Sequence, residues 1–187
     1  MSQYYYTVSS LPYLKYDSKP PLNIDSFLDI CRQECTKRDL FLLQQTRLIP
    51  DCQDSPCFYL LKLWYSWEAN LRVEIAFLRS RKKELSISKQ YEISWSEIPE
   101  AKQIAHINFL QDSPLSAEEG LNIARWTFLD NLELNHHFDI EKLIIYKLKL
   151  LLLLRKSVFT REKGEESFKN ILNTFYTELG SLESSYE

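Results

Sequence analysis

Apolar residues recur at intervals of three and four along most of this chain, which is the spacing of amphipathic α-helices. The pattern is strongest over residues 140–158, where apolar positions occupy several faces of one helix. Asp139 precedes this stretch as a predicted N-cap, because its carboxylate can accept from the unpaired amides of the first turn. One neighbour cannot cover so much apolar surface, so we expect a central, enclosed helix.

A second long helix is predicted over residues 56–83. Ser55 and Pro56 form its start signal, since a hydroxyl can cap and proline suits the first helical position. Within this helix Glu68 and Arg72 lie one turn apart in the favoured acid-first order. We interpret them as a structural charge pair between packed helices rather than as a functional pair in a cleft.

Start and stop signals predict five further helices, at about 24–35, 37–49, 97–110, 116–134 and 162–179. Ser116 with Glu119 forms a capping box for the helix that begins there. Residues 85–95 are interpreted as a connection with weak strand character. The final helix is expected to turn its apolar stripe inward, namely Phe168, Ile171, Leu172, Phe175, Tyr176 and Leu179.

Residues 4–16 are rich in aromatic side chains. At the start of this segment Tyr4, Tyr6 and Val8 alternate with Tyr5, Thr7 and Ser9. This alternation favours an extended segment lying on the helices, although a short first helix is also compatible with it. Only 3 of the 187 residues are glycine, which disfavours a turn-dense β architecture. We therefore predict an all-α, multi-helix bundle with two long core helices, forming a single helical domain over residues 1–187.

Charge and hydropathy limit the binding partners and the cellular location that we expect for this chain. The net charge is −3 with both signs interspersed, whereas a nucleic-acid-binding protein usually carries a basic excess. The N-terminus lacks the charged and apolar regions of a secretory signal, and the longest apolar run, residues 150–154, is far below the roughly 20 residues of a membrane span. We expect a cytoplasmic protein without direct membrane insertion, whose cysteines are thiols.

His136, His137 and Asp139 are the most compact group of potential metal or acid/base residues. The simpler interpretation is that the histidines end one helix while Asp139 caps the next. A metal site would need a further ligand, such as His106. Asp130 and Glu133, nearby in sequence, fit either a solvated helix face or partners for basic residues in the core.

The remaining motifs do not indicate catalysis. Cys31, Cys35, Cys52 and Cys57 lack the usual C-x2-C spacing of zinc sites. No Ser-His-Asp signature, nucleophile elbow, Walker loop or dinucleotide fingerprint occurs, so we expect no enzymatic activity and no cofactor.

A basic cluster ends the helix predicted at 56–83, where positive charge suits the helix dipole; it consists of Arg79, Arg81, Lys82 and Lys83. The simplest interpretation is a solvated helix end. As a binding surface the cluster would suit lipid headgroups or an acidic protein better than nucleic acid.

Residues 4–12, 67–82 and 126–155 together resemble an uncharacterised bacterial family encoded in operons for vacuolar-type (A/V-type) ATP synthases. The strongest markers lie in the third stretch and include Trp126, His137, Phe138 and Tyr146. In these operons the family looks like a counterpart of the C/d-type adaptor of the central stalk. That all-helical adaptor couples the rotor shaft to the membrane ring of proteolipid subunits and has no catalytic residues.

The resemblance implies a non-catalytic subunit of a bacterial V-type ATPase, located at the cytoplasmic face of the inner membrane through that complex. Its partners would be components of the central stalk, the proteolipid ring, or both. One alternative is an assembly factor or scaffold for the same ATPase. Another is a small metal-dependent enzyme or regulator that uses the cluster from His136 to Asp139.

Overall fold

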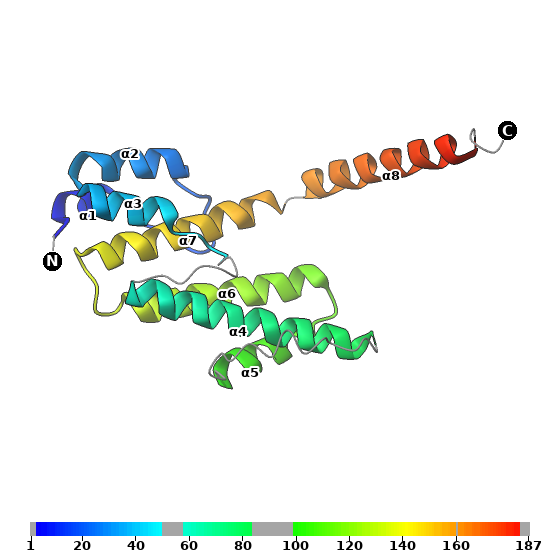
Figure 1. Cartoon of the computed structure of the whole chain (residues 1–187), viewed down its shortest axis with the longest axis horizontal. Coiled ribbons are helices and arrows are strands. Elements are labelled where there is room, and N and C mark those ends of the chain that lie inside the picture. The colour runs from blue at the N-terminus through cyan, green and yellow to red at the C-terminus, as the bar shows by residue number, and fades with distance from the viewer. Residues whose placement is uncertain (1–2, 50–57, 84–98, 160, 184–187) are drawn as a thin grey trace.

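The computed structural model describes residues 3–49, 58–83, 99–159 and 161–183, the last range with its side chains from 164 to 176. These residues contain eight helices and no strand, which confirms the predicted all-α fold (Figure 1). The helices are α1 (Tyr5–Ser10), α2 (Ile24–Glu34), α3 (Lys37–Gln45), α4 (Tyr59–Lys82), α5 (Pro99–Phe109), α6 (Pro114–Glu133), α7 (Ile140–Val158) and α8 (Arg161–Glu183).

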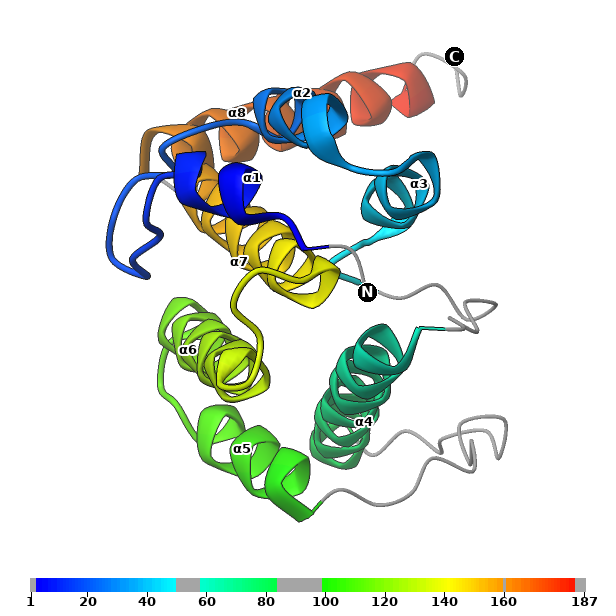
Figure 2. The same ribbon diagram turned by 90° about the vertical axis from the view of Figure 1, so that its left-hand side faces the viewer.

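Helix α7 is the centre of the bundle. Helices α1, α2 and α3 lie on one side of it, and α4, α5 and α6 lie on the other (Figure 2). Of its 19 residues 9 are buried, including Leu143, Leu148 and Leu152, so the prediction of an enclosed central helix is confirmed. Each fully buried leucine or isoleucine stabilises the fold by roughly 1.5–3 kcal/mol.

Helix α4 joins this core through leucines and a set of aromatic side chains. The Trp67 ring stacks on Phe128 of α6 with centroids 4.5 Å apart, and Trp64 lies 5.9 Å from Trp67. The helix falls within the predicted range 56–83, beginning at Tyr59 after Phe58, which makes no side-chain capping bond. Ser55, the expected cap, lies outside the described residues.

The predicted cap of α6 is wrong by three residues, because Ser113 and not Ser116 caps the helix. The helix begins at Pro114, and the Leu115 amide donates to Ser113 Oγ at 3.3 Å, so Ser116 lies inside the helix instead of capping it. The Ser113–Pro114 pair outcompetes the capping box because proline already holds the backbone angle of the first helical turn. Asp139, in contrast, caps α7, accepting from the Lys142 amide at 3.0 Å.

The N-terminal segment also differs from the expected extended form, because residues 5–10 form helix α1. No strand in the described part of the chain offers the segment a partner, whereas a helix satisfies its own backbone. The start of α1 is fixed by the buried Tyr4, whose amide donates to the Phe138 carbonyl at 2.6 Å. Beyond α1 the chain is not helical, and buried Leu14 holds it against the bundle.

The inward orientation predicted for the last helix is wrong. Helix α8 projects away from the bundle (Figure 1), and Phe168, Ile171 and Phe175 are 62%, 68% and 56% exposed. An amphipathic pattern requires an apolar face but does not specify which surface covers it. The residues with predicted strand character, 85–95, lie outside the described ranges. Among the described helices, none has both the length and the apolar character needed to cross a bilayer.

Gly120 allows a close approach between α6 and α5. A Cβ atom at this position would lie 1.8 Å from Asn108 Oδ1. Asn108 cannot easily give way, since it is buried and its Nδ2 donates to the Ile104 carbonyl at 2.9 Å. Gly164 in α8 is a natural control because a Cβ there would meet no heavy atom within 4 Å.

We predict that Gly120→Ala lowers the free energy of unfolding by about 1–3 kcal/mol through overpacking. Gly164→Ala should instead increase helicity, since alanine favours a helix over glycine by about 1 kcal/mol. Urea denaturation followed by circular dichroism measures both effects. Equal stability of Gly120→Ala and the parent chain would contradict the close approach of the two helices.

Candidate functional site

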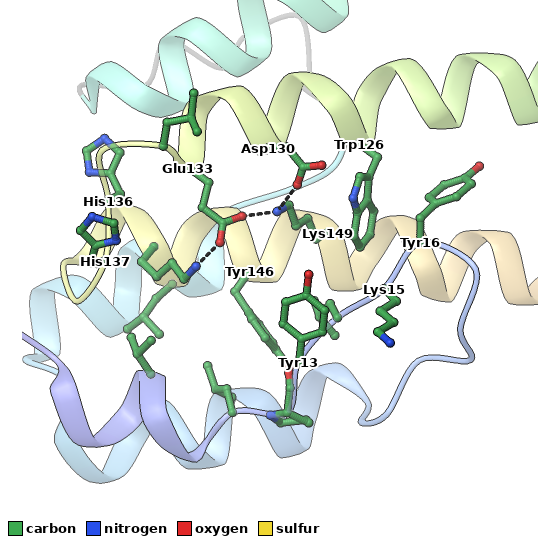
Figure 3. Close-up of a pocket in the computed structure, with 17 residues that line it drawn as sticks. Tyr13, Lys15, Tyr16, Trp126, Asp130, Glu133, His136, His137, Tyr146 and Lys149 are labelled. Atoms are coloured by element: carbon green, nitrogen blue, oxygen red, sulfur yellow. Dashed lines mark hydrogen bonds and ion pairs between the residues drawn. The ribbon is translucent and has the colours of Figure 1, made fainter.

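A groove of about 880 Å³ runs between residues 8–16, α6 and α7, and we call it the N-terminal groove (Figure 3). Its two helical walls use the same spacing, at positions i, i+4 and i+7, which places three side chains on one helix face. The α6 row is Trp126, Asp130 and Glu133, and the α7 row is Lys142, Tyr146 and Lys149.

The charges of the two rows neutralise one another. Glu133 accepts from the ammonium groups of both Lys142 and Lys149, and Lys149 Nζ also lies 2.5 Å from Asp130 Oδ1. Burial by itself would raise the pKa of Glu133, but the hydrogen bonds from the two lysines outweigh it and lower that pKa. Glu133 is therefore a partner of basic residues, whereas Asp130, 52% exposed, pairs with Lys149 from a solvated helix face.

The phenol groups of the groove serve as hydrogen-bond donors or packing surfaces. Tyr146 Oη donates to the Pro12 carbonyl at 2.8 Å, and burial raises its pKa. Burial, followed by the negative charges of Glu119 and Asp17, raises the pKa of Tyr16 to about 12. Both phenols stay protonated near neutral pH, so their contacts attach the N-terminal segment to the bundle rather than supply a base.

Glu68 belongs to a larger network than the predicted pair with Arg72. Arg72 Nε donates to its carboxylate at 2.8 Å, and Arg125 of α6 holds the same carboxylate with two bonds, at 2.9 Å and 3.1 Å. The side chains of Glu68 and Arg125 are 1% and 3% exposed. Arg125 also donates to Asn122 and Glu118. This buried network links α4 to α6.

Sequence reasoning missed Arg125 because it lies 57 residues from Glu68. It also missed Lys147, which is buried and donates to the Leu43 carbonyl at 2.5 Å at the end of α3. Burial lowers the pKa of Lys147 to about 8. The available signal was a cationic residue within an apolar helical stretch, which implies a buried partner.

The histidine cluster forms with a different third member. His136 Nδ1 lies 2.6 Å from Asp139 Oδ2, and Glu141 joins them, with one potential ligand atom from each residue within 4.8 Å of the others. His137 lines the N-terminal groove, and His106 is exposed on α5. Glu141, which α7 supplies two residues after its cap, therefore takes the place expected for His137, and the additional ligand expected from His106 is not part of the group.

The basic cluster and the cysteines lie away from the N-terminal groove and the histidine cluster. Arg79, Arg81 and Lys82 occupy the last turn of α4, followed by Lys83 at its C-cap. Cys31 in α2 and Cys35 at its C-cap are free cysteines four residues apart. Their mutual hydrogen bond raises the pKa of Cys31, aided by burial, and lowers that of Cys35. Cys52 and Cys57 lie outside the described residues.

These contacts define an all-helical protein in which the interior charges of the described residues serve mainly to join helices. The family model described as "Protein of unknown function (DUF2764)" matches residues 86–179, half of the chain, so the chain belongs to this family. The match covers α5, α6, α7 and most of α8, and thus both helical walls of the N-terminal groove. No curated protein and no solved structure matches the chain.

We predict that Glu68→Gln lowers the free energy of unfolding by about 3–5 kcal/mol, because the buried Arg125 would lose its two-bond carboxylate partner and keep only the more exposed Glu118 at 3.3 Å. Arg72→Gln is the control: this side chain is 41% exposed, and Glu68 would retain Arg125, so the loss should be about 1 kcal/mol or less. Urea denaturation measures both. Similar losses for the two variants would show that the network is not organised around a buried Glu68–Arg125 pair.

Proposed function

We propose that this chain is a non-catalytic subunit of a bacterial V-type ATPase. Its role would be that of a C/d-like central-stalk adaptor between the rotor shaft and the proteolipid ring. The resemblance of residues 4–12, 67–82 and 126–155 to a family encoded in V-type ATPase operons suggests the complex. The observation that carries the adaptor role is the exposed apolar face of α8, which projects from the bundle.

The apolar face of α8 has the spacing of a helix that packs against another helix. Phe168, Leu172 and Phe175 are separated by four and three residues, and in sequence Leu179 and Leu182 continue the alternation. Spacings that alternate between four and three residues keep one apolar stripe of a helix facing a partner helix. We call this stripe of α8 the seam. Exposed apolar surface of this extent is typical of protein contact sites. We propose that an amphipathic helix of another ATPase component covers this seam.

The bundle itself supports a mechanical role. The aromatic stack of Trp64, Trp67 and Phe128 joins α4 to α6, while Tyr146 and Pro12 link α7 to the N-terminal segment. Close-packed interiors deform little and transmit strain. An adaptor that passes torque between two partners needs such a body, with one face on the stalk and another on the ring.

The test is recovery of ATPase components with the tagged full-length chain from its native cell. We predict that Phe168→Glu with Phe175→Glu abolishes recovery, because two carboxylates would have to be buried in the interface. The matched control, Asn170→Glu with Thr174→Glu, adds the same charge to another face of α8 and should retain recovery. Circular dichroism should show that both double variants fold, since all four side chains are exposed.

Stoichiometric retention in the purified motor supports an adaptor. Recovery of partial complexes only, with the chain absent from the finished motor, would indicate the alternative role as an assembly factor. In a third arrangement a second copy of this chain covers the seam. Light scattering would then show a stable dimer of the parent chain and a monomer of the variant with Phe168→Glu and Phe175→Glu. Loss of recovery in both double variants would argue against a specific contact through this face.

The cluster of His136, Asp139 and Glu141 favours a second candidate, a metal-dependent regulator or small enzyme. Glu141 Oε2 is enclosed and has no hydrogen-bond partner among the described residues, so it is available as a ligand. Imidazole and carboxylate groups are common zinc ligands. The competing assignment is structural, since Asp139 already caps α7 and contacts His136.

Metal analysis of the purified full-length chain distinguishes these assignments. The regulator predicts stoichiometric zinc or another divalent metal, lost in His136→Ala and retained in His137→Ala, because only His136 belongs to the cluster. Metal-free protein from metal-replete medium, with no binding in a zinc titration, would eliminate this candidate. The adaptor proposal would be unaffected by that result.

A further inference from the structure

A second hollow, which we call the basic pocket, lies between the C-terminal half of α4, the N-terminal half of α6 and the end of α7. Its volume is about 640 Å³, within the range of roughly 300–1,000 Å³ typical of small-molecule sites. Part of its lining is apolar, from Ile75, Ala76 and Leu121. Six of its lining side chains are cationic: Arg72, Arg79, Lys82, Lys83, Arg125 and Arg155.

The carboxylates of the described residues do not neutralise these six cationic side chains. Glu118 lines the pocket and accepts from Arg155 Nη2 at 2.5 Å and Arg125 Nη1 at 3.3 Å. Glu68 accepts two further hydrogen bonds from Arg125 and one from Arg72. Six cationic groups against two carboxylates leave an excess of four positive charges.

The excess charge is concentrated at one end of the pocket. Among the described residues Arg79 and Lys83 have no carboxylate within salt-bridge distance, and Lys82 Nζ lies 5.8 Å from the centre of the Phe109 ring. Like charges gathered at a concave surface repel one another and focus a positive potential. An anion bound among them would relieve that repulsion.

Arg155, which lines the pocket, also carries an unsatisfied donor. Its Nη1 is enclosed, yet it has no hydrogen-bond partner among the described residues. An enclosed guanidinium donor without an acceptor costs free energy, more than a neutral donor would. Glu118 accepts from Nη2 of the same guanidinium, so the group is held in place before any ligand arrives.

We propose that the basic pocket binds a phosphate-bearing anion. Guanidinium groups match the geometry of phosphate oxygens and can form two parallel hydrogen bonds with them, while lysines add charge. The excess of four positive charges favours a group with several negative charges, such as a diphosphate, over a single carboxylate. Arg79, Lys82 and Lys83 of the basic cluster line this pocket, whereas Arg81 does not.

Two sources share this chemistry: a soluble phosphate compound and the headgroup of an anionic lipid. The purified full-length chain should be titrated calorimetrically with pyrophosphate, and separately with inorganic phosphate, at low ionic strength. In parallel, flotation with phosphatidylglycerol vesicles should be compared with flotation using phosphatidylcholine vesicles. Binding of pyrophosphate identifies a soluble ligand, and flotation only with phosphatidylglycerol identifies a headgroup.

The deciding comparison uses two double variants with equal loss of charge from α4. Arg79→Gln with Lys83→Gln removes two pocket cations, and binding should weaken by roughly tenfold or more for each charge-assisted bond lost. Arg81→Gln with Lys62→Gln removes two exposed cations outside the pocket and should leave binding nearly unchanged. All four side chains are exposed, so both variants should fold.

Either of two results would overturn the proposal. The first is the absence of binding to pyrophosphate, inorganic phosphate and phosphatidylglycerol vesicles. The second is equal weakening in both double variants, which would reveal attraction to overall charge only. The proposal does not depend on the ATPase assignment, because binding is measured on the isolated chain, while recovery of ATPase components depends on α8.

Discussion

The burial of α7 between two groups of helices is the constraint on which the rest of this structure depends. Its apolar residues face two groups of helices, so neither group alone could keep them from water. Helices α2 and α3 cover one side of α7. Helix α6 covers the other side and in turn contacts α4 and α5. The middle position of α7 therefore follows from apolar side chains on more than one face of this 19-residue helix.

Such an interior has to accommodate the cationic residues that interrupt its apolar stretches. Each is buried against acceptors supplied by another element: Arg125 against Glu68, Lys149 against Glu133, and Lys147 against the carbonyl groups that end α3. A buried charge is tolerated only when it is paired or hydrogen-bonded. These contacts consequently determine how the helices are placed relative to one another, in addition to the less directional packing of leucines.

Surfaces without such internal partners are where the protein can interact with other molecules. The apolar seam of α8 and the excess positive charge of the basic pocket differ in chemistry, and they lie on different elements. The seam suits a helix of a partner protein, whereas the pocket suits a small anion. A role as an adaptor in a membrane-bound motor is compatible with both, since such an adaptor contacts other proteins close to anionic lipid headgroups.

The sequence by itself determined the helical fold, the central position of α7 and the cap at Asp139, because periodicity and capping are local properties of the chain. It favoured an extended form for residues 4–16 over the alternative of a short first helix, whereas residues 5–10 form that helix. It could not supply Arg125 as the partner of Glu68, or Glu141 in place of His137. Nor could it show that α8 would leave its apolar face uncovered. Only the tertiary structure decided these points, because they depend on which distant elements meet, and a one-dimensional pattern states only that a face must be covered.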